Sequence, residues 1–320
     1  MTEIAIDVRR LTKKFGAKIV VNNIDIQVPK GKIYGFLGPN GSGKTTTIRM
    51  LCGLLRPTSG EGKCLGLDIM KDALMIRKKV GYMTQKFSFW DDLTVRENLE
   101  FTAHIYELKN ASALIDKTLI NFGLEKKAHL LAGTLSGGWK QRLALSACIL
   151  HKPEILLLDE PTAGVDPKAR REFWDELGRL SDEGMTILVS THYMDEAERC
   201  DELIYIAYGN LMVKGTISEV INKTQLKTIE VSGLSLPLLQ KQLGQDPEII
   251  AMSLFGKTLR ICGNNEQNII NKLQILKNKY SLSWQESNTH LEDAFIFYLK
   301  KAQDSMNPII DHMIDNGVLL

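Results

Sequence analysis

The sequence predicts an α/β fold built around a parallel β-sheet. Three runs are almost entirely apolar: residues 33–37, 155–158 and 186–190. Stretches with helical character separate them, and this alternation is typical of a parallel sheet covered on both faces. A glycine-rich loop follows the first run directly and precedes a helix. Strand, loop and helix in this order form the setting in which phosphate-binding loops occur.

The composition is that of an ordinary globular protein long enough for two domains. Of the 320 residues, 44% are hydrophobic and 24% are charged, and the net charge is +2. This charge gives no reason to expect binding to nucleic acid, which usually requires a clustered basic face. The five cysteines are scattered and form no C-x-x-C pair, so we expect buried, reduced thiols. No apolar run approaches the roughly 20 residues that span a bilayer, and the first residues lack the pattern of a signal peptide.

The first domain is predicted to cover residues 1–225. Residues 4–8 and 19–28 alternate between apolar and polar side chains, which indicates half-exposed antiparallel strands beside the parallel core sheet. Residues 86–152 are predicted to form a helical subdomain. Within it, Thr94 and Glu97 fit a capping box that begins one helix, and a second helix is expected from residue 138 to 151, before a proline.

The character of the sequence changes after residue 215. Short strands are predicted at 228–232, 249–254 and 258–262, and helices at 235–243, 266–279 and 290–301. This alternation suggests a small α+β domain of ferredoxin-like type over residues 226–302. Residues 303–320 are expected to form a tail or a docking helix.

The glycine-rich loop matches the phosphate-binding pattern G-x-x-x-x-G-K-[ST]. Glycines let successive backbone N–H groups converge on an anion, and the helix N-terminus adds the positive end of its dipole. We expect Lys44 to reach the β- and γ-phosphates of ATP and the Thr45 hydroxyl to bind Mg²⁺. The predicted nucleotide-binding residues of this segment are Gly38, Pro39, Asn40, Gly41, Ser42, Gly43, Lys44, Thr45 and Thr46.

Two adjacent carboxylates end the apolar strand at residues 155–158. Asp159 is placed to hold Mg²⁺, through water. Glu160 is placed to act as the general base for an attacking water molecule. One carboxylate serves the metal and the other must touch the water, so neighbouring residues take different roles.

A second candidate anion site lies at Ser136, Gly137 and Gly138, where two glycines precede a predicted helix. With Leu135 before them, and after the phosphate-binding loop and before the acidic strand end, these residues make the chain resemble an ATP-binding cassette (ABC) transporter ATPase. The family's signature is Leu-Ser-Gly-Gly-Gln, and this chain has Trp139 at the last position. The three phosphate-facing residues are intact.

The resemblance, which covers about residues 4–225, implies roles for four further residues. Gln85 matches the glutamine that touches Mg²⁺ or the attacking water, and His192 matches the switch histidine that contacts the γ-phosphate. Asp166 belongs to the loop that crosses the dimer interface, although Ala163 stands where the family usually has serine. Phe15 matches the aromatic residue that stacks on adenine. Lys44, Gln85, Glu160 and His192 are thus the predicted catalytic residues, and Thr45, Gln85 and Asp159 the predicted metal ligands.

The resemblance also implies partners. In this family the signature residues complete the ATP site of a second copy, so a head-to-tail homodimer around two ATP molecules is expected. Residues 134–215 are most similar to the ATPases of daunorubicin-resistance-like and multidrug exporters. The membrane-spanning permease would be a separate polypeptide, which makes the chain a cytoplasmic protein held on the inner face of the membrane. The expected contact lies near Phe87, Phe89 and Trp90, unless these aromatic side chains fill the core of the helical subdomain instead.

Two alternatives remain open. A non-transport ABC ATPase acting on DNA ends would carry a long coiled coil, whereas about ninety residues separate Lys44 from Ser136. Members that act on ribosomes usually carry two cassettes in one chain. An importer ATPase commonly ends in a β-rich regulatory barrel, whereas residues 226–300 are predicted to be mixed α/β.

Overall fold

The computed structural model describes residues 3–315, with side chains described up to residue 304. The chain divides into two compact units between Leu211 and Met212. The domain boundary predicted after residue 225 therefore falls inside the second unit. None of the helices in the described part of the chain combines the length and the apolar character needed to cross a lipid bilayer.

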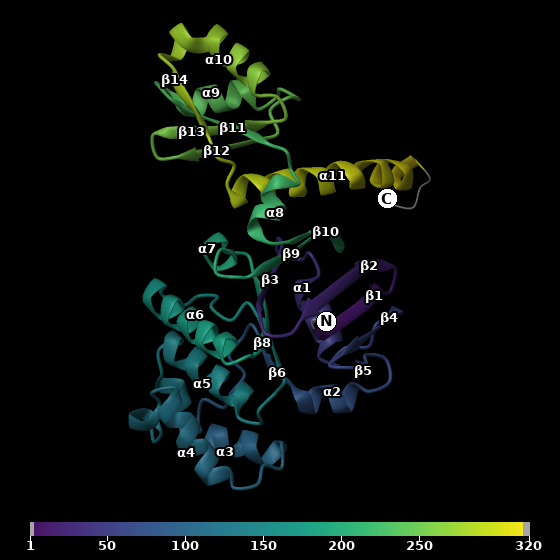
Figure 1. The fold of residues 1–320 in the computed structure, drawn as a ribbon, viewed down its shortest axis with the longest axis vertical. Helices are drawn as coiled ribbons and strands as arrows, with labels where there is room; N and C mark the ends of the chain where they lie inside the picture. Colours follow the sequence, from purple (N-terminus) through teal and green to yellow (C-terminus); the bar gives the residue numbers. More distant parts are fainter. Residues whose placement is uncertain (1–2, 316–320) are drawn as a thin grey trace. The chain divides into compact units, whose positions relative to one another are not determined.

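A six-stranded sheet in the order β10-β9-β3-β8-β7-β6 runs through the first unit (Figure 1), and its edge strand β10 contains the residues at which the chain divides. Neighbours β9, β3, β8, β7 and β6 pair in parallel, which confirms the predicted parallel sheet. Every residue of β3, β7 and β8 is buried, as their apolar sequences predict. The strands are β3 (Ile33–Leu37), β6 (Val80–Met83), β7 (Ile155–Asp159), β8 (Thr186–Thr191), β9 (Glu202–Ala207) and β10 (Asn210–Gly215).

A second sheet of the first unit has the order β2-β1-β4-β5 and is antiparallel, as its alternating sequence predicts. Its inward side chains share one hydrophobic core with α1 and with residues of the parallel sheet. The first two strands are longer than the alternation indicated, because β-bulges let the pairing continue past the interruptions in the pattern. The strands are β1 (Ile4–Phe15), β2 (Lys18–Pro29), β4 (Ser59–Cys64) and β5 (Leu67–Asp68).

Helices fill the chain between these strands. The predicted capping box is present: the Thr94 hydroxyl accepts from the Glu97 amide, and the Glu97 carboxylate accepts from the Thr94 amide. The helices are α1 (Lys44–Leu51), α2 (Ala73–Lys79), α3 (Val95–Ile105), α4 (Ala111–Asn121), α5 (Gly137–Ile149), α6 (Pro167–Asp182) and α7 (Met194–Ala197), with short 3-10 turns at Glu125–Lys127 and Ala132–Thr134.

The second unit contains a four-stranded antiparallel sheet in the order β12-β13-β11-β14, with two helices packed into its core. Arg260 is buried in this unit, where it pairs with Asp293 at 2.8 Å and Glu230 at 2.6 Å. The last helix continues through the predicted tail as far as Asp315, and residues 316–320 lie outside the described part. The elements are α8 (Ile217–Asn222), β11 (Lys227–Ser232), α9 (Leu236–Leu243), β12 (Ala251–Phe255), β13 (Thr258–Gly263), α10 (Glu266–Tyr280), β14 (Ser283–Ser287) and α11 (Leu291–Asp315).

Candidate functional site

The glycine-rich loop joins the end of β3 to the start of α1 and is held tightly by its surroundings. Gly38 has φ +152°, and a Cβ atom there would lie 2.0 Å from the Ile206 carbonyl oxygen. Gly43 has φ +103°, and a Cβ there would lie 2.7 Å from the Val20 carbonyl oxygen. Both positions therefore require glycine for two reasons, the left-handed backbone and the close approach of a neighbouring strand. At Gly41, by contrast, no atom lies within 4 Å of the Cβ position, so that side of the loop is open.

Lys44 is folded back over the loop. Its ammonium group donates to the carbonyl oxygens of Gly38 at 2.7 Å and Pro39 at 3.2 Å, and it lies 3.4 Å from the Glu160 carboxylate. Only 4% of the residue is exposed. Burial lowers the pKa of Lys44, and the nearby Glu160 carboxylate opposes that shift. A buried cation is thus held at the mouth of an anion-binding loop.

Asp159 lies opposite the first turn of α1. The Thr45 hydroxyl donates to its carboxylate at 3.0 Å, and the Ser190 hydroxyl donates to the same oxygen at 2.8 Å. Ser190 is the residue that faces Asp159 in the pairing of β7 with β8. The two predicted metal ligands Thr45 and Asp159 therefore meet directly.

The Glu160 side chain contacts residues that follow the two neighbouring strands of the parallel sheet. Its carboxylate accepts from the Gln85 amide at 3.0 Å and lies 3.4 Å from Nδ1 of His192. Its backbone N–H donates to the Ser190 hydroxyl at 2.9 Å. The residue is a non-glycine with φ +47°, a sparsely populated conformation that recurs at functional sites. Gln85, Glu160 and His192 follow β6, β7 and β8, so the parallel order of these strands brings the three side chains together.

A cavity of about 250 Å³ lies over the loop. It is lined by Val20, Asn40, Gly41, Ser42, Gly43, Lys44, Thr45, Thr46, Gln85 and Glu160. The structure thus gathers most of the predicted loop residues and three of the four predicted catalytic residues, Lys44, Gln85 and Glu160, around one space.

These residues fit a bound nucleotide phosphate and Mg²⁺. The buried Ser42 hydroxyl has no hydrogen-bond partner within the described chain, and Gly41, with no atom within 4 Å of its Cβ position, leaves room for an anion. The Thr45 hydroxyl and the Asp159 carboxylate are oxygen ligands of the kind that Mg²⁺ prefers. No group of three or more histidine, cysteine or acidic side chains in the described residues forms a metal cage. Mg²⁺ at nucleotide sites is held by few protein groups together with phosphate oxygens, so the small ligand set is compatible with it.

Other predicted site residues lie outside this cavity's lining. Ser136 is the N-cap of α5, and its side chain makes no capping bond; Gly137 and Gly138 are the first residues of that helix. Asp166 caps α6 by accepting from the amides of residues 168 and 169. Phe15 ends β1, is 51% exposed, and has the Lys13 ammonium 5.0 Å from its ring centre.

The aromatic segment after Gln85 is only partly buried. Phe87 and Phe89 are half-buried, with ring centres 5.5 Å apart. Trp90 is 45% exposed and packs edge-on against Phe101 at 4.1 Å. Trp139, at the unusual signature position, lies against cationic side chains, with the Lys127 ammonium 4.7 Å from its ring.

Ser190 is a site residue that no sequence motif singled out: its hydroxyl donates to Asp159 and accepts from the backbone N–H of Glu160. It is a buried polar residue near the carboxyl end of β8, directly after the apolar residues 187–189. That pattern was a usable signal, since a polar side chain at the carboxyl end of a parallel strand faces the ligand-binding edge of the sheet.

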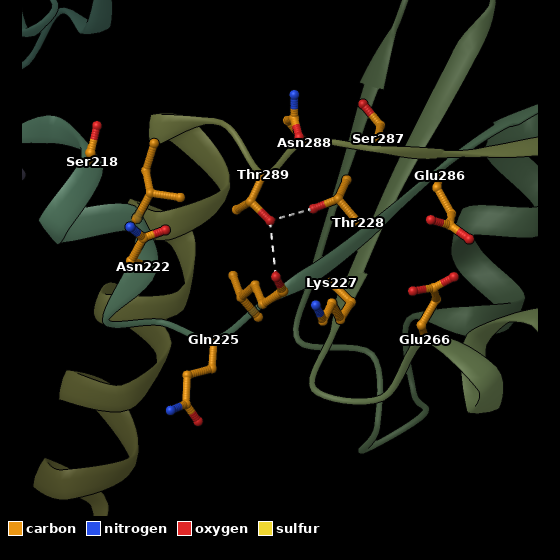
Figure 2. A pocket seen from close by; sticks show the side chains of 12 residues that line it. Ser218, Asn222, Gln225, Lys227, Thr228, Glu266, Glu286, Ser287, Asn288 and Thr289 are labelled. Atoms are coloured by element: carbon orange, nitrogen blue, oxygen red, sulfur yellow. Dashed lines mark hydrogen bonds between the residues drawn. The ribbon is translucent and has the colours of Figure 1, made fainter.

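Figure 2 shows a larger concavity, of about 960 Å³, in the second unit. Thr289 joins Thr228 at 2.9 Å across one side of it, and Glu266 and Glu286 point toward each other on the other. The hydrogen bond to Glu286 raises the pKa of Glu266. None of the residues described as lining it belongs to the predicted nucleotide site.

Comparison with known sequences gives a consistent family assignment. The profile of the ABC transporter family matches residues 21–163. The probable multidrug ABC transporter ATP-binding protein YbhF of Escherichia coli (strain K12) is 44% identical over 216 residues, which are 67% of this chain and 37% of that protein. The chain thus aligns with well under half of YbhF. The Nod factor export ATP-binding protein I of Burkholderia lata is 37% identical over 295 residues, or 91% of this chain and 95% of that protein.

Solved structures give the same fold. A structure of cbiO1 from Clostridium perfringens, described as part of the ABC transporter complex cbiONQ, has a TM-score of 0.63 and 25% identity, covering 77% of this chain and 96% of its own. A dimeric structure of the ATP-binding cassette MJ0796 in a post-hydrolysis state, bound to ADP and Pi, has a TM-score of 0.60 and 27% identity. The match covers 66% of this chain and 98% of the MJ0796 chain.

Proposed function

The chain belongs to the ABC transporter ATP-binding family, and from this premise we propose that it hydrolyses ATP to drive a separate membrane permease that exports its substrate. The observation that carries the proposal is the convergence on Glu160. A buried carboxylate lies within 3.4 Å of Lys44, Gln85 and His192, beside a cavity lined by the phosphate-binding loop.

ATP binding is assigned to residues whose positions suit it. The backbone amides of the loop and the Lys44 ammonium would bind the phosphates, and the exposed Phe15 ring would stack on adenine. Stacking of this kind contributes about 0.5–1.5 kcal/mol beyond burial. Thr45, Asp159 and Gln85 would hold Mg²⁺, and bound Mg²⁺ would neutralise charge on the β- and γ-phosphates.

Hydrolysis is assigned to Glu160 as general base, with His192 contacting the γ-phosphate. In the described structure the Lys44 ammonium compensates the charge of Glu160, and the Gln85 amide donates a hydrogen bond to the same carboxylate. Phosphate binding would give Lys44 a second anionic partner, and Glu160 would then be free to accept a proton from water. Lys44 and the backbone donors would stabilise the charge on the transferred phosphoryl group.

A second copy of the chain completes the site in this proposal. The N-terminus of α5 is formed by Ser136, Gly137 and Gly138, and the Ser136 hydroxyl makes no capping bond. A head-to-tail dimer would bring these residues to the phosphates of the ATP bound by the partner. The loop that ends at Asp166 would cross the same interface. The dimeric form in which MJ0796 was solved supports this arrangement.

Export is favoured over import because two relatives bear export or multidrug names. The permease would be a separate membrane protein that contacts the partly exposed aromatic segment at Phe87, Phe89 and Trp90. In that arrangement the chain would lie on the cytoplasmic face of the membrane. The exported compound is proposed to be a drug or another lipophilic molecule.

Replacing Glu160 by glutamine tests the proposal. Glu160→Gln keeps the shape of the side chain but removes the base, so ATP should still bind while hydrolysis falls about 10²–10⁴-fold. The variant should also accumulate as an ATP-bound dimer. Turnover is measured by phosphate release, binding by titration with a fluorescent ATP analogue, and assembly by size-exclusion chromatography.

Glu154→Gln is the matched control, because Glu154 precedes the same strand at its other end and forms an exposed ion pair with Lys79. This control should hydrolyse ATP normally. Normal turnover of Glu160→Gln would show that Glu160 is not the base.

A further inference from the structure

Glu196 is a buried carboxylate that takes no part in the mechanism above. It lies on the short helix α7, four residues after His192. The residue is 1% exposed. A charged side chain at such a position is costly unless it is paired and hydrogen-bonded, so its contacts identify what it holds.

Both carboxylate oxygens accept hydrogen bonds from threonine hydroxyls. Thr191, the residue before His192, donates to Oε2 at 2.5 Å. Thr162, two residues after Glu160, donates to Oε1. Each threonine is 1% exposed. One carboxylate therefore joins the segment that carries the proposed base to the segment that carries the switch histidine.

A third segment reaches the same carboxylate through Arg170 on α6. Its Nε lies 3.6 Å from Oε1 of Glu196, and its guanidinium lies 4.1 Å above the ring of Tyr193. The amide of Arg170 donates to the carbonyl oxygen of Asp166 at 2.9 Å. The loop proposed to cross the dimer interface is thus linked to the segment that follows His192.

We propose that Glu196 is a positioning residue, which couples the orientation of Glu160, His192 and the Asp166 loop through Thr162, Thr191 and Arg170. The inference rests on the proposed function, because it assigns a role in ATP hydrolysis. Glu196 makes no described contact with Glu160 or His192 themselves. It acts on them through the backbone: the hydroxyl-to-carboxylate bonds fix Thr162 and Thr191, and these residues fix the backbone positions of the segments that carry Glu160 and His192.

Glu196→Gln is the direct test. Glutamine has nearly the same shape, but its NH₂ group cannot accept a hydroxyl bond, and it loses the attraction to Arg170. The kcat for ATP should fall about 10- to 100-fold, as for other residues that orient catalytic groups. The KM should change less than about threefold, since the phosphate-binding loop is untouched.

The two threonines separate positioning from simple loss of packing. Thr162→Val and Thr191→Val preserve side-chain shape but remove the hydroxyl, so each should lower kcat. Thr162→Ser keeps the hydroxyl and should retain most of the wild-type kcat. Combining Glu196→Gln with Thr162→Val should lower kcat little further than Glu196→Gln alone, because both break the same link.

Asp293→Asn provides the stability control, since Asp293 is an equally buried carboxylate paired with Arg260 in the second unit. It should lower the melting temperature without changing kcat per folded molecule. A wild-type kcat in Glu196→Gln, or an equal loss of kcat in Asp293→Asn, would overturn the inference while leaving the proposed function intact. An inactive wild-type protein would instead overturn the proposed function, and the positioning role with it.

Discussion

Gly43 shows how closely a single position in the phosphate-binding loop is constrained. Its φ of +103° disfavours any side chain, and a Cβ would meet both the Val20 carbonyl oxygen at 2.7 Å and Cγ2 of Val21 at 3.2 Å. Glu160 also has a positive φ, although it carries a side chain. Such strain persists where the surrounding bonds hold the residue in place, and here the Glu160 amide is bonded to Ser190.

Gly43→Ala should therefore displace the loop. The left-handed backbone alone costs an alanine about 1–2 kcal/mol, and the clash with the Val20 backbone adds to that cost. We expect a lower melting temperature and at least about a tenfold loss of affinity for ATP, the equivalent of 1.4 kcal/mol. Thermal melts and a fluorescent-nucleotide titration measure the two effects.

Gly31→Ala is the control for this prediction. Gly31 has φ +78°, but no atom lies within 4 Å of its Cβ position. Only the backbone strain should appear, as a small drop in melting temperature with unchanged ATP affinity. Equal behaviour of the two variants would contradict the role given to close packing at Gly43.

His151 joins elements of the first unit. It follows α5, stacks on Tyr106 at the end of α3 with ring centres 3.9 Å apart, and places Nε2 3.3 Å from the Val80 carbonyl oxygen at the start of β6. Its Nδ1 is buried without a partner among the described residues. Burial lowers the pKa of His151 to about 4, and the Val80 carbonyl only partly offsets this shift.

This shift predicts a loss of stability in acid. The unfolded chain binds a proton at His151 near pH 6.5, whereas the folded protein resists protonation until about pH 4. His151 therefore causes no loss of stability above pH 6.5. As the pH drops from 6.5 to 4, the unfolded chain gains a proton that the folded protein does not, and the free energy of unfolding falls. His151→Phe keeps an aromatic ring on Tyr106 but cannot be protonated, so its stability should fall less.

Urea denaturation at several pH values between 7 and 4 measures this difference. His104→Gln is the control, because His104 lies exposed on α3. It should show the same acid dependence as the wild type. If the free energy of unfolding of His151→Phe fell with pH as steeply as that of the wild type, groups other than His151 would cause the loss of stability in acid.

A composite ATP site is the main expectation for the whole molecule. In one chain, the cavity is lined by the phosphate-binding loop, Gln85 and Glu160, while Ser136 stands at the start of α5 outside that lining. In the proposed dimer the other half of each site would come from the partner, and we expect neither half to act alone.

Mixing two inactive variants tests this directly. Lys44→Ala removes the phosphate-binding cation, and Ser136→Arg blocks the signature with a bulky side chain. In a mixed dimer one site combines the intact loop of the Ser136→Arg chain with the intact Ser136 of the other chain. Phosphate release should therefore reappear on mixing, up to about half of the wild-type rate per mixed dimer if the two sites act independently. Activity that stays absent at every mixing ratio would argue against a head-to-tail dimer.

The features that depend on a short stretch of residues could be predicted from the amino-acid sequence. The apolar runs specified β3, β7 and β8, Thr94 and Glu97 specified a helix start, and the spacing of Gly38, Gly43 and Lys44 specified the phosphate-binding loop. In each case the pattern of residue types lies within a short stretch of the chain, so it is visible in the sequence even where the contacts that require it come from distant residues.

Which distant groups meet becomes visible in the folded chain alone. The strand order β3-β8-β7-β6 brings Gln85, Glu160 and His192 together, although about 75 residues separate Gln85 from Glu160. The pairing of Asp159 with Ser190, the Glu196 link and the division after Leu211 have the same origin. Sheet register and the pairing of distant side chains depend on contacts across the fold, and no local pattern of residues encodes them.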